Sequence, residues 1–433
     1  MRTKRNIFED IDWITLLIYV ILAVFGWACI YSATYSEANE TLSLLDTKQG
    51  KQLLFMGISG MAAIALLFLD HRFFETLAYG VYGLGIFLLI LVLFLGSEIK
   101  GAQSWFVMGP ISFQPSEIAK FGTALALAKY LGNHQNNFNS FSTRIRSIAI
   151  IALPPALIML QPDVGSVLVF SALSIVLYRE GLSGWIFIVG FVAIILFISA
   201  LYTKQYQWEL FGVLIKGKVA FLTALTIVSG FFYYVVRKAK GSLFIVFGAL
   251  VAMIGFFLSV DYVFDNVLKP HHQNRINELL GIVSDPRGAG YNVYQSKIAI
   301  GSGGFSGKGF MEGTQTQLKY VPEQFTDFIF STLGEEWGFV GTFGVIVLFV
   351  FLMARIVWLA EKQRSAFTRI YGYCVASIFF IHFAINIGMT IGLAPVIGIP
   401  LPFFSYGGSS LLSFTLLLFT FIKLDSERKF VLR

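Results

Sequence analysis

The chain has 433 residues, of which 56% are hydrophobic and only 13% are charged, with a mean hydropathy of +0.73. A soluble domain carries about 25% charged residues, so this composition excludes an ordinary soluble protein. The net charge of +7 does not indicate nucleic acid as a partner, because the basic residues stand in short loops between apolar stretches, where they bear on membrane orientation.

Windows of about 20 apolar residues recur along the chain, and each is long enough to cross a bilayer about 30 Å thick. We therefore predict an all-α polytopic membrane protein with about twelve transmembrane helices. The expected spans are 13–33, 52–69, 77–96, 115–131, 147–160, 164–178, 184–202, 219–236, 242–260, 327–354, 367–391 and 405–423.

Both cysteines, Cys29 and Cys374, lie inside these apolar stretches. They are expected to be small buried hydrophobic residues, and neither a disulfide nor a metal framework is predicted. No cleavable signal peptide is evident, and the first apolar stretch is long enough to remain as an anchor.

The short loops indicate the orientation. When spans alternate from an inside N-terminus, most Lys and Arg residues fall on one side, whereas the short segments 161–163 and 394–404 on the other side have none. The positive-inside rule then places both termini in the cytoplasm and a long 261–325 loop outside. Segment 203–218 has three lysines on the predicted outer side, which does not fit the positive-inside rule. The other short loops fit it, and we follow them. An outside loop has no access to ATP.

The segment 285–330 is polar and rich in glycine, in a chain that is otherwise mostly hydrocarbon. Loops of this length usually carry function or stay disordered. Apolar residues such as Ile298, Phe305 and Phe310 are spaced through it, which favours a folded loop. Its sequence IGSGGFSGKGF matches neither the P-loop nor the GxGxxG pattern, so no nucleotide is expected.

Three prolines, Pro115, Pro162 and Pro402, interrupt apolar sequence just before new helices, all on the predicted outer side. Proline fits the first helical turn, and a helix N-terminus attracts anions through its free N–H groups and partial positive charge. Together with Lys297 and Lys308 these helix ends are suited to a phosphate. The alternative, that the prolines only shape helix ends, remains open.

Carboxylates and a lysine stand near the same side of the predicted bundle. Glu117 and Lys120 are three residues apart on the fourth helix, a spacing that predicts an ion pair, and charges at membrane depth usually face a cavity or a partner. Glu323 and Asp327 stand four apart where the long loop enters the next helix, which predicts one shared helix face. Deeper in that helix we expect at least one of Glu335 and Glu336 simply to bond neighbouring groups.

The order of motifs resembles the SEDS family (shape, elongation, division and sporulation) of bacterial cell-wall polymerases. The sequence GTQTQL and the PE that follows it resemble the rod-shape branch of that family more than its division branch. The motifs are QPSEIAK, QPDVG, SDPRGAGYNVYQSKIAIGSGG, GKG, GTQTQL, PE, TDFIF, EEWGFVG, NIGM and GIPLPFFSYGGSS.

Two features depart from the family. Phe325 stands where the family usually has histidine, so a role for that histidine cannot be carried over. The family typically has ten spans, and 204–260 looks like an inserted pair. The resemblance therefore implies a SEDS-type bundle in four parts: the N-terminal bundle 1–203, the inserted hairpin 204–260, the extracytoplasmic catalytic loop 261–325 and the C-terminal helices 326–433.

The resemblance implies peptidoglycan glycosyltransfer for cell-wall elongation and cell shape, with lipid II as donor and acceptor and undecaprenyl diphosphate as leaving group. Asp285 in SDPRGAG matches the proposed catalytic aspartate, and a carboxylate can take the proton of the acceptor hydroxyl. The expected substrate-binding residues are Gln114, Glu117, Lys120, Gln295, Ser296, Lys308, Glu323, Asp327, Ser405 and Tyr406.

The resemblance also implies a setting for this activity. We expect a multi-pass protein of the bacterial cytoplasmic membrane whose partners are a class B penicillin-binding protein (a transpeptidase) and other membrane proteins of the elongation machinery. A divalent cation such as Mg²⁺ is compatible with a diphosphate leaving group, but no metal-binding residues can be named from the sequence.

Two other functions remain open, a lipid II flippase and a secondary transporter. The number of expected spans suits a transporter, but the chain shows no repeated half. A transporter should also place its polar residues near the midplane of the membrane, whereas this sequence concentrates them in one outer loop.

Overall fold

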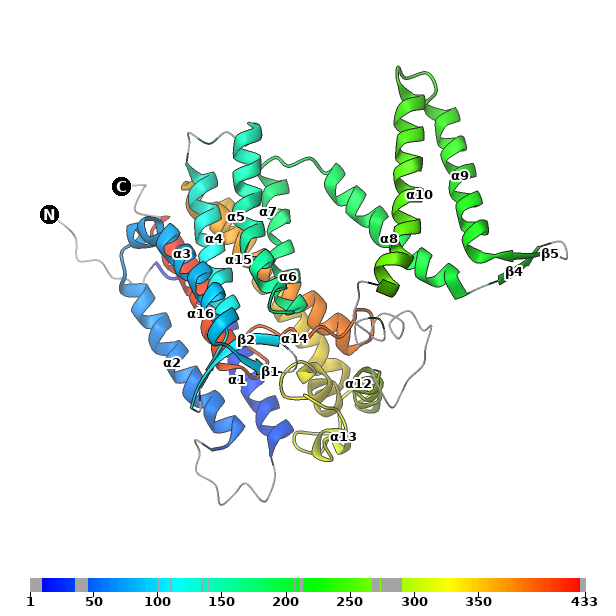
Figure 1. The fold of residues 1–433 in the computed structure, drawn as a ribbon. Helices are drawn as coiled ribbons and strands as arrows, with labels where there is room; N and C mark the ends of the chain where they lie inside the picture. Colours follow the sequence, from blue (N-terminus) through cyan, green and yellow to red (C-terminus); the bar gives the residue numbers. More distant parts are fainter. Residues whose placement is uncertain are drawn as a thin grey trace. The chain divides into compact units, whose positions relative to one another are not determined.

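A computed structural model describes residues 10–35, 46–99, 102–109, 111–133, 136, 138, 140–205, 207–210, 213–266, 273 and 290–428. The chain divides into two compact units. The main unit comprises Met1–Leu182 and Asn292–Arg433, and the second unit is Ser183–Tyr291. Figure 1 shows the course of the chain through its helices.

Ten of the described helices are long and apolar enough to cross a membrane. This finding confirms the predicted helical, polytopic membrane architecture. In the main unit they are α1 (Trp13–Thr34), α2 (Lys48–Phe68), α3 (His71–Leu95), α5 (Phe141–Met159), α14 (Ile329–Glu361), α15 (Ala366–Thr390) and α16 (Gly408–Ser426). In the second unit they are α8 (Trp185–Gln205), α9 (Gly217–Val236) and α10 (Ser242–Asn266).

Two further helical segments stand where the remaining spans were expected. They are α4 (Pro115–Gly132) and the consecutive short helices α6 (Val164–Ser171) and α7 (Leu173–Arg179). The α6–α7 segment is apolar but shorter than a standard span, and α4 carries charged residues in both its first and last turns. The count of about twelve spans therefore stays a prediction.

Short polar residues fix where several helices begin. Asp12, Thr47 and Asp70 cap α1, α2 and α3, each accepting a backbone N–H from the first turn of its helix. Such caps satisfy N–H groups that have no partner inside the helix. The helix starts at 13, 48 and 71 therefore follow from local sequence as well as from hydropathy.

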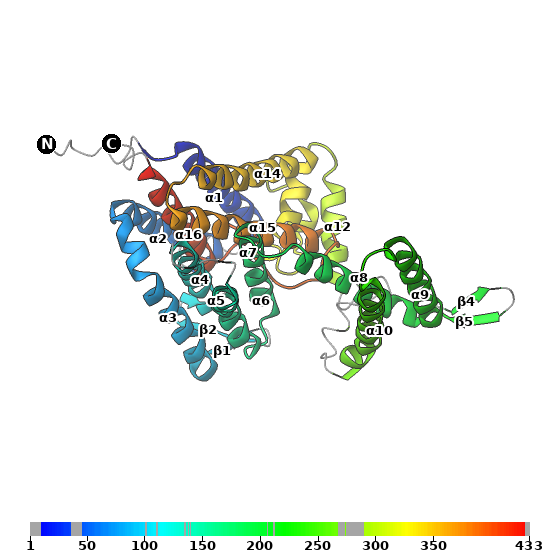
Figure 2. The same ribbon diagram turned by 90° about the horizontal axis from the view of Figure 1, so that it is seen from above.

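The helices α4, α15 and α16 lie in the middle of the main unit, with α1 and α14 on one side and α3 and α5 on the other (Figure 2). Close packing of α3 on α4 depends on two glycines. A Cβ at Gly85 would lie 3.0 Å from Ala119 Cα, and one at Gly122 would lie 2.9 Å from Tyr82 Cα. The charged first turn of α4 is thereby held inside the bundle.

The loop expected between the third and fourth spans contains a small sheet that the sequence did not predict, although the fold remains mostly helical. Strands β1 (Ser97–Ile99), β2 (Ala102–Met108) and β3 (Ile111–Phe113) pair antiparallel in that order. Strand β2 contains Trp105, Phe106 and Val107, aromatic and β-branched residues of the kind enriched in strands. Gly109, with φ of 62°, lies in the tight connection between β2 and β3.

In the second unit, α9 and α10 run side by side and are joined by the short turn at 237–241 (Figure 1). That this pair is an insertion into the family bundle stays a prediction. A separate apolar core joins them to α8, where Phe257 stacks on Phe221 with ring centroids 4.9 Å apart. The predicted boundaries at 203 and 260 fall inside α8 and α10. Strands β4 (Gln207–Leu210) and β5 (Val213–Lys216) form a hairpin before α9.

The described part of the expected long loop is folded, with α12 (Tyr291–Ser302) and α13 (Thr314–Gln317) in it. The next helix, α14, begins only at Ile329. Glu323 has a positive φ of 56°, and its position in a turn before the helix makes the predicted shared helix face of Glu323 and Asp327 wrong. Both carboxylates precede the first residue of α14, so no helix aligns them.

Candidate active site

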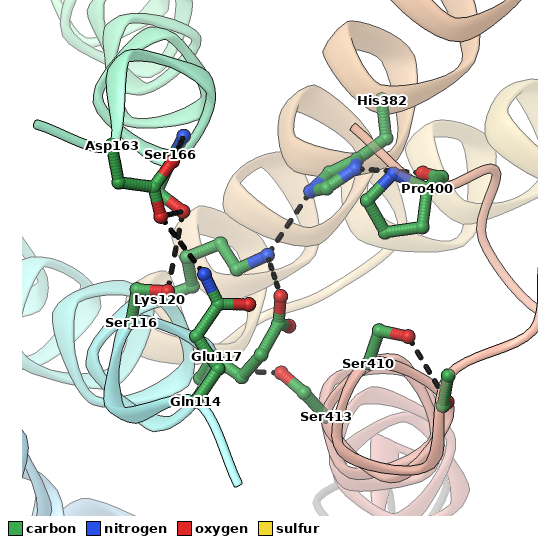
Figure 3. Close-up of polar contacts among 11 residues, drawn as sticks. Gln114, Ser116, Glu117, Lys120, Asp163, Ser166, His382, Pro400, Ser410 and Ser413 are labelled. Atoms are coloured by element: carbon green, nitrogen blue, oxygen red, sulfur yellow. Dashed lines mark hydrogen bonds and ion pairs between the residues drawn. The ribbon is translucent and has the colours of Figure 1, made fainter. Parts of the chain in front are cut away.

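The first turns of α4 present two charges on one face. Lys120 Nζ donates to Glu117 Oε1 at 2.8 Å, and the two side chains are only 2% and 4% exposed. The predicted ion pair is confirmed (Figure 3). Charges are costly to bury unless each is paired and hydrogen-bonded, so the bundle must be built around this pair.

His382 of α15 is a third member of the site. Its Nε2 lies 3.1 Å from Lys120 Nζ, its Nδ1 lies 3.0 Å from the Pro400 carbonyl oxygen, and the ring is 1% exposed. The ring also meets Phe414 of α16 edge to face. The sequence reasoning missed His382, because a single histidine in an apolar helix carries no signal of a partner on another helix.

Glu117 has further bonding capacity. Ser413 Oγ of α16 donates to its backbone carbonyl at 2.9 Å. Its second carboxylate oxygen is buried and has no hydrogen-bond partner among the described residues. A buried polar atom of this kind carries a desolvation cost that a bound ligand with a donor group would offset.

Gln114 precedes α4 and joins it to α6. Its Nε2 donates to Asp163 Oδ2 at 2.8 Å. Asp163 caps α6 by accepting the Ser166 N–H and hydroxyl, and the Ser116 and Ser166 hydroxyls lie 3.2 Å apart. The QPSE and QPDV motifs therefore meet, and Asp163 is a site residue that the sequence reasoning did not single out.

The N-terminal parts of α4, α6 and α16 lie close together (Figure 3). The Gln114–Asp163 bond joins the starts of α4 and α6, and the Ser413–Glu117 bond joins α16 to α4. The proline-marked helix starts were predicted to lie together, and these contacts agree with that prediction. Three helix N-termini direct partial positive charge to one region. With the Lys120 ammonium nearby, the region suits an anionic group.

Lys308 and Glu335 form a second ion pair, in which the lysine is 27% exposed and the carboxylate is fully buried. Lys308 Nζ donates to Glu335 Oε1 at 2.6 Å, and the fully buried carboxylate also accepts the N–H groups of Gln315 and Thr316. The expectation that one of Glu335 and Glu336 bonds its neighbours is confirmed. The ammonium of Lys308 thus holds the 303–318 segment on α14, and no described contact joins it to Lys120.

Several other predicted substrate residues make bonds within the protein. Ser296 is fully buried and donates to the Thr390 carbonyl at 2.9 Å, whereas Gln295 beside it is half-buried on α12. Ser405 Oγ accepts the Leu401 N–H. Tyr406 donates its N–H to the Phe325 carbonyl, and burial raises the pKa of the Tyr406 hydroxyl.

A cavity of about 340 Å³ lies between the end of α1, the start of α2 and residues 319–325, and Glu323 lines it. Lys48 Nζ lies 3.5 Å above the ring of Phe325 in this cavity. The backbone carbonyl of Asp327 accepts from Asn386 Nδ2 at 2.9 Å. Glu323 and Asp327 therefore share no helix face, although both lie in the segment that precedes α14.

Asp285, the expected catalytic residue, lies outside the described residues. No group of three or more His, Cys, Asp or Glu side chains that could hold a metal ion occurs in the described part of the chain.

The fold and the site define a class: a multi-pass membrane protein with a buried, charged site where helix N-termini converge. The family profile described as cell cycle protein, covering FtsW, RodA and SpoVE, matches residues 12–220 and 220–429. The chain belongs to this family, which confirms the SEDS resemblance.

Relatives of the whole chain agree. The peptidoglycan glycosyltransferase MrdB of Escherichia coli strain K12 is 33% identical over 411 residues, covering 94% of this chain and 92% of MrdB. The peptidoglycan glycosyltransferase RodA of Treponema pallidum is 32% identical over 437 residues, covering 93% and 94%. One chain of a solved peptidoglycan synthase complex that coordinates polymerisation and crosslinking is 28% identical, with a TM-score of 0.67 and coverage of 96% and 98%.

Proposed function

We propose that this protein polymerises lipid II into glycan strands at the outer face of the bacterial cytoplasmic membrane, for cell-wall elongation and cell shape. It is a peptidoglycan glycosyltransferase of its family, as its full-length relatives are. The observation that carries the proposal is the buried Glu117–Lys120–His382 site. A fixed cation beside three helix N-termini is what a diphosphate leaving group requires.

The proposed reaction is one glycosyl transfer between two lipid II molecules. The C4 hydroxyl oxygen of the acceptor sugar forms a bond to C1 of the donor sugar, while the bond from C1 to the diphosphate oxygen breaks. Asp285 takes the hydroxyl proton as general base. The electron pair leaves with undecaprenyl diphosphate, whose added negative charge needs stabilisation.

Lys120 is proposed to stabilise that charge, and Glu117 to orient the ammonium and accept a bond from the substrate headgroup. Gln114, Gln295, Glu323, Asp327 and Tyr406 remain proposed substrate contacts. Lys308, Ser296 and Ser405 are already bonded within the protein, which favours a role in shaping the site. A divalent cation such as Mg²⁺ remains a proposal for the substrate's diphosphate, and no step here is routed through one.

The proposed orientation has both termini in the cytoplasm and the catalytic loop outside, on the basis of the Lys and Arg distribution in short loops. We propose a class B penicillin-binding protein as the complex partner. The similarity to a chain of a complex that couples polymerisation to crosslinking supports this choice.

The test is glycan synthesis from lipid II by the purified full-length protein. We expect polymer from the natural protein and none from Asp285→Asn, which keeps the shape of the side chain but lacks a basic carboxylate. Binding of lipid II and the melting temperature should be unchanged. Near-normal polymer from Asp285→Asn would refute the catalytic assignment, and no polymer from the natural protein with its partner would refute the function.

A further inference from the structure

We propose that His382 is a positioning residue for this reaction: it accepts one N–H bond of Lys120 and so fixes the direction in which the ammonium faces the substrate. The proposal rests on the proposed function, because it names a residue that sets the geometry of that site.

The hydrogen bonds define the state of the imidazole. Nδ1 lies 3.0 Å from the carbonyl oxygen of Pro400, which can only accept, so Nδ1 carries the proton. Nε2 lies 3.1 Å from Lys120 Nζ, and an ammonium can only donate. Nε2 therefore presents its lone pair, and His382 is a neutral ring that donates on one side and accepts on the other.

The same bonds define the direction of the ammonium. A lysine ammonium has three N–H bonds in a tetrahedral arrangement. One points to Glu117 Oε1 and a second to His382 Nε2, which determines where the third must point. Among the described residues no further acceptor receives it. With Glu117 alone, the ammonium could rotate about a single contact.

The ring itself is held firmly. It is buried at 1% exposure and meets Phe414 edge to face, with centroids 4.8 Å apart. Lys120 Nζ lies 5.2 Å from the centroid of the same Phe414 ring. The bond to Pro400 connects the ring to the 398–410 segment. A shift of this segment would therefore move the ring and, with it, the acceptor of the Lys120 ammonium. A histidine that only filled the core would not need its second nitrogen against an ammonium.

Two conservative variants separate the two bonds of the ring. His382→Gln places an amide oxygen near the position of Nε2, where it can accept from Lys120. His382→Asn places an amide N–H near the position of Nδ1, where it can donate to Pro400, but it has no acceptor for Lys120. We expect His382→Gln to retain most of the polymerisation rate, and His382→Asn and His382→Phe to lose about 100-fold, as misplacement of a catalytic group does.

The loss should fall on kcat rather than on KM, since the bond to the leaving group strengthens only as charge develops. In a Lys120→Met background, His382→Phe should cause no further loss of rate, because the group that it positions is gone. Equal rates for all three His382 variants per folded molecule would overturn the proposal while leaving the proposed function intact.

A second measurement does not need activity. The melting temperatures of His382→Phe, Lys120→Met and the double variant form a cycle. We expect the double variant to lose less than the sum of the single losses, because both remove the same bond. Strictly additive losses would overturn the proposal even if the natural protein made no glycan, a result that would by itself refute only the proposed function.

Discussion

At the scale of single residues, the buried pair of Glu117 and Lys120 is expected to determine both stability and activity. Replacing either partner leaves one charge buried alone, at a cost of about 3 to 5 kcal/mol. We expect Glu117→Gln and Lys120→Met each to lower the melting temperature of the purified protein and to abolish most glycan synthesis per folded molecule.

The matched control for this pair is Glu361→Gln. Glu361 accepts from Arg179 at 3.0 Å, but the two side chains are 46% and 53% exposed. Solvated ion pairs contribute within about 1 kcal/mol, so this variant should melt and polymerise like the natural protein. A purely structural Glu117–Lys120 pair would show lowered stability with unchanged turnover, contrary to our expectation.

We expect the carboxyl group of Asp12 to make the stability of the folded protein depend on pH. Burial raises the pKa of this carboxyl, but hydrogen bonds from Arg355 and Thr15 outweigh the burial and leave its pKa below the ordinary 3.8. A depressed pKa stabilises the folded state above the ordinary value, and this stabilisation is lost as the pH falls through the folded-state pKa.

Asp12→Asn keeps a helix cap but removes the charge that faces Arg355. We expect it to cost about 2 kcal/mol at pH 7, with the difference from the natural protein shrinking below about pH 4, near the ordinary pKa of aspartate. Thermal melts in detergent between pH 7 and pH 3 measure it. Asp70→Asn, at a 68% exposed cap, should show a much smaller difference; equal behaviour of the two variants would contradict the argument.

The candidate site was only partly predictable at this scale. The pair of Glu117 and Lys120 is visible in sequence because both residues lie on one helix, three positions apart. His382 and Asp163 come from other parts of the chain, so the sequence does not show that they lie beside Glu117 and Lys120. Lys308, predicted as a substrate contact, donates to Glu335, a tertiary contact that the sequence alone does not reveal.

At the scale of elements, α14 depends on one glycine. Gly338 interrupts the helix with φ of 60° and ψ of −157°, a conformation that other residues rarely adopt. A Cβ there would lie 2.3 Å from the Gly307 nitrogen. The break thus lets the glycine-rich segment dock against α14, just beyond the Glu335 carboxylate that holds it.

Gly338→Ala should therefore destabilise the protein by at least about 3 kcal/mol. We expect a lower melting temperature and faster proteolysis of the 303–318 segment. Gly344→Ala is the matched control on the same helix, where an added Cβ meets nothing within 4 Å. It should be neutral or stabilise by about 0.5 to 1 kcal/mol; similar losses in both variants would contradict a special role for Gly338.

The elements themselves were largely predictable, because apolar length determines a membrane span and caps determine its start. Predicted and observed bounds agree closely for α1, at 13–33 and Trp13–Thr34. The β1–β3 sheet was not predicted. It depends on a backbone turn at Gly109 that hydropathy does not register.

At the scale of the whole molecule, the sequence predicts a family bundle with an added hairpin at 204–260, a division that stays a prediction. The structure describes a second unit, Ser183–Tyr291, with its own apolar core. The apolar core of the main unit contains none of the described residues between 183 and 291. Hydropathy alone did not reveal that α8 shares the apolar core of α9 and α10, because hydropathy identifies apolar helices and not which of them pack together.

Excision of residues 206–266 with a short linker is the test of a peripheral insertion. It removes β4, β5, α9 and α10 and an even number of predicted spans, so the sidedness of the following chain is kept. Because the main core draws on no residue there, we expect its melting temperature to persist and some glycan synthesis to remain. Phe257→Ala, which opens the second core at about 3 to 5 kcal/mol, should likewise spare polymerisation. Complete loss of activity in an excised protein that still folds would show that the hairpin belongs to the catalytic machinery.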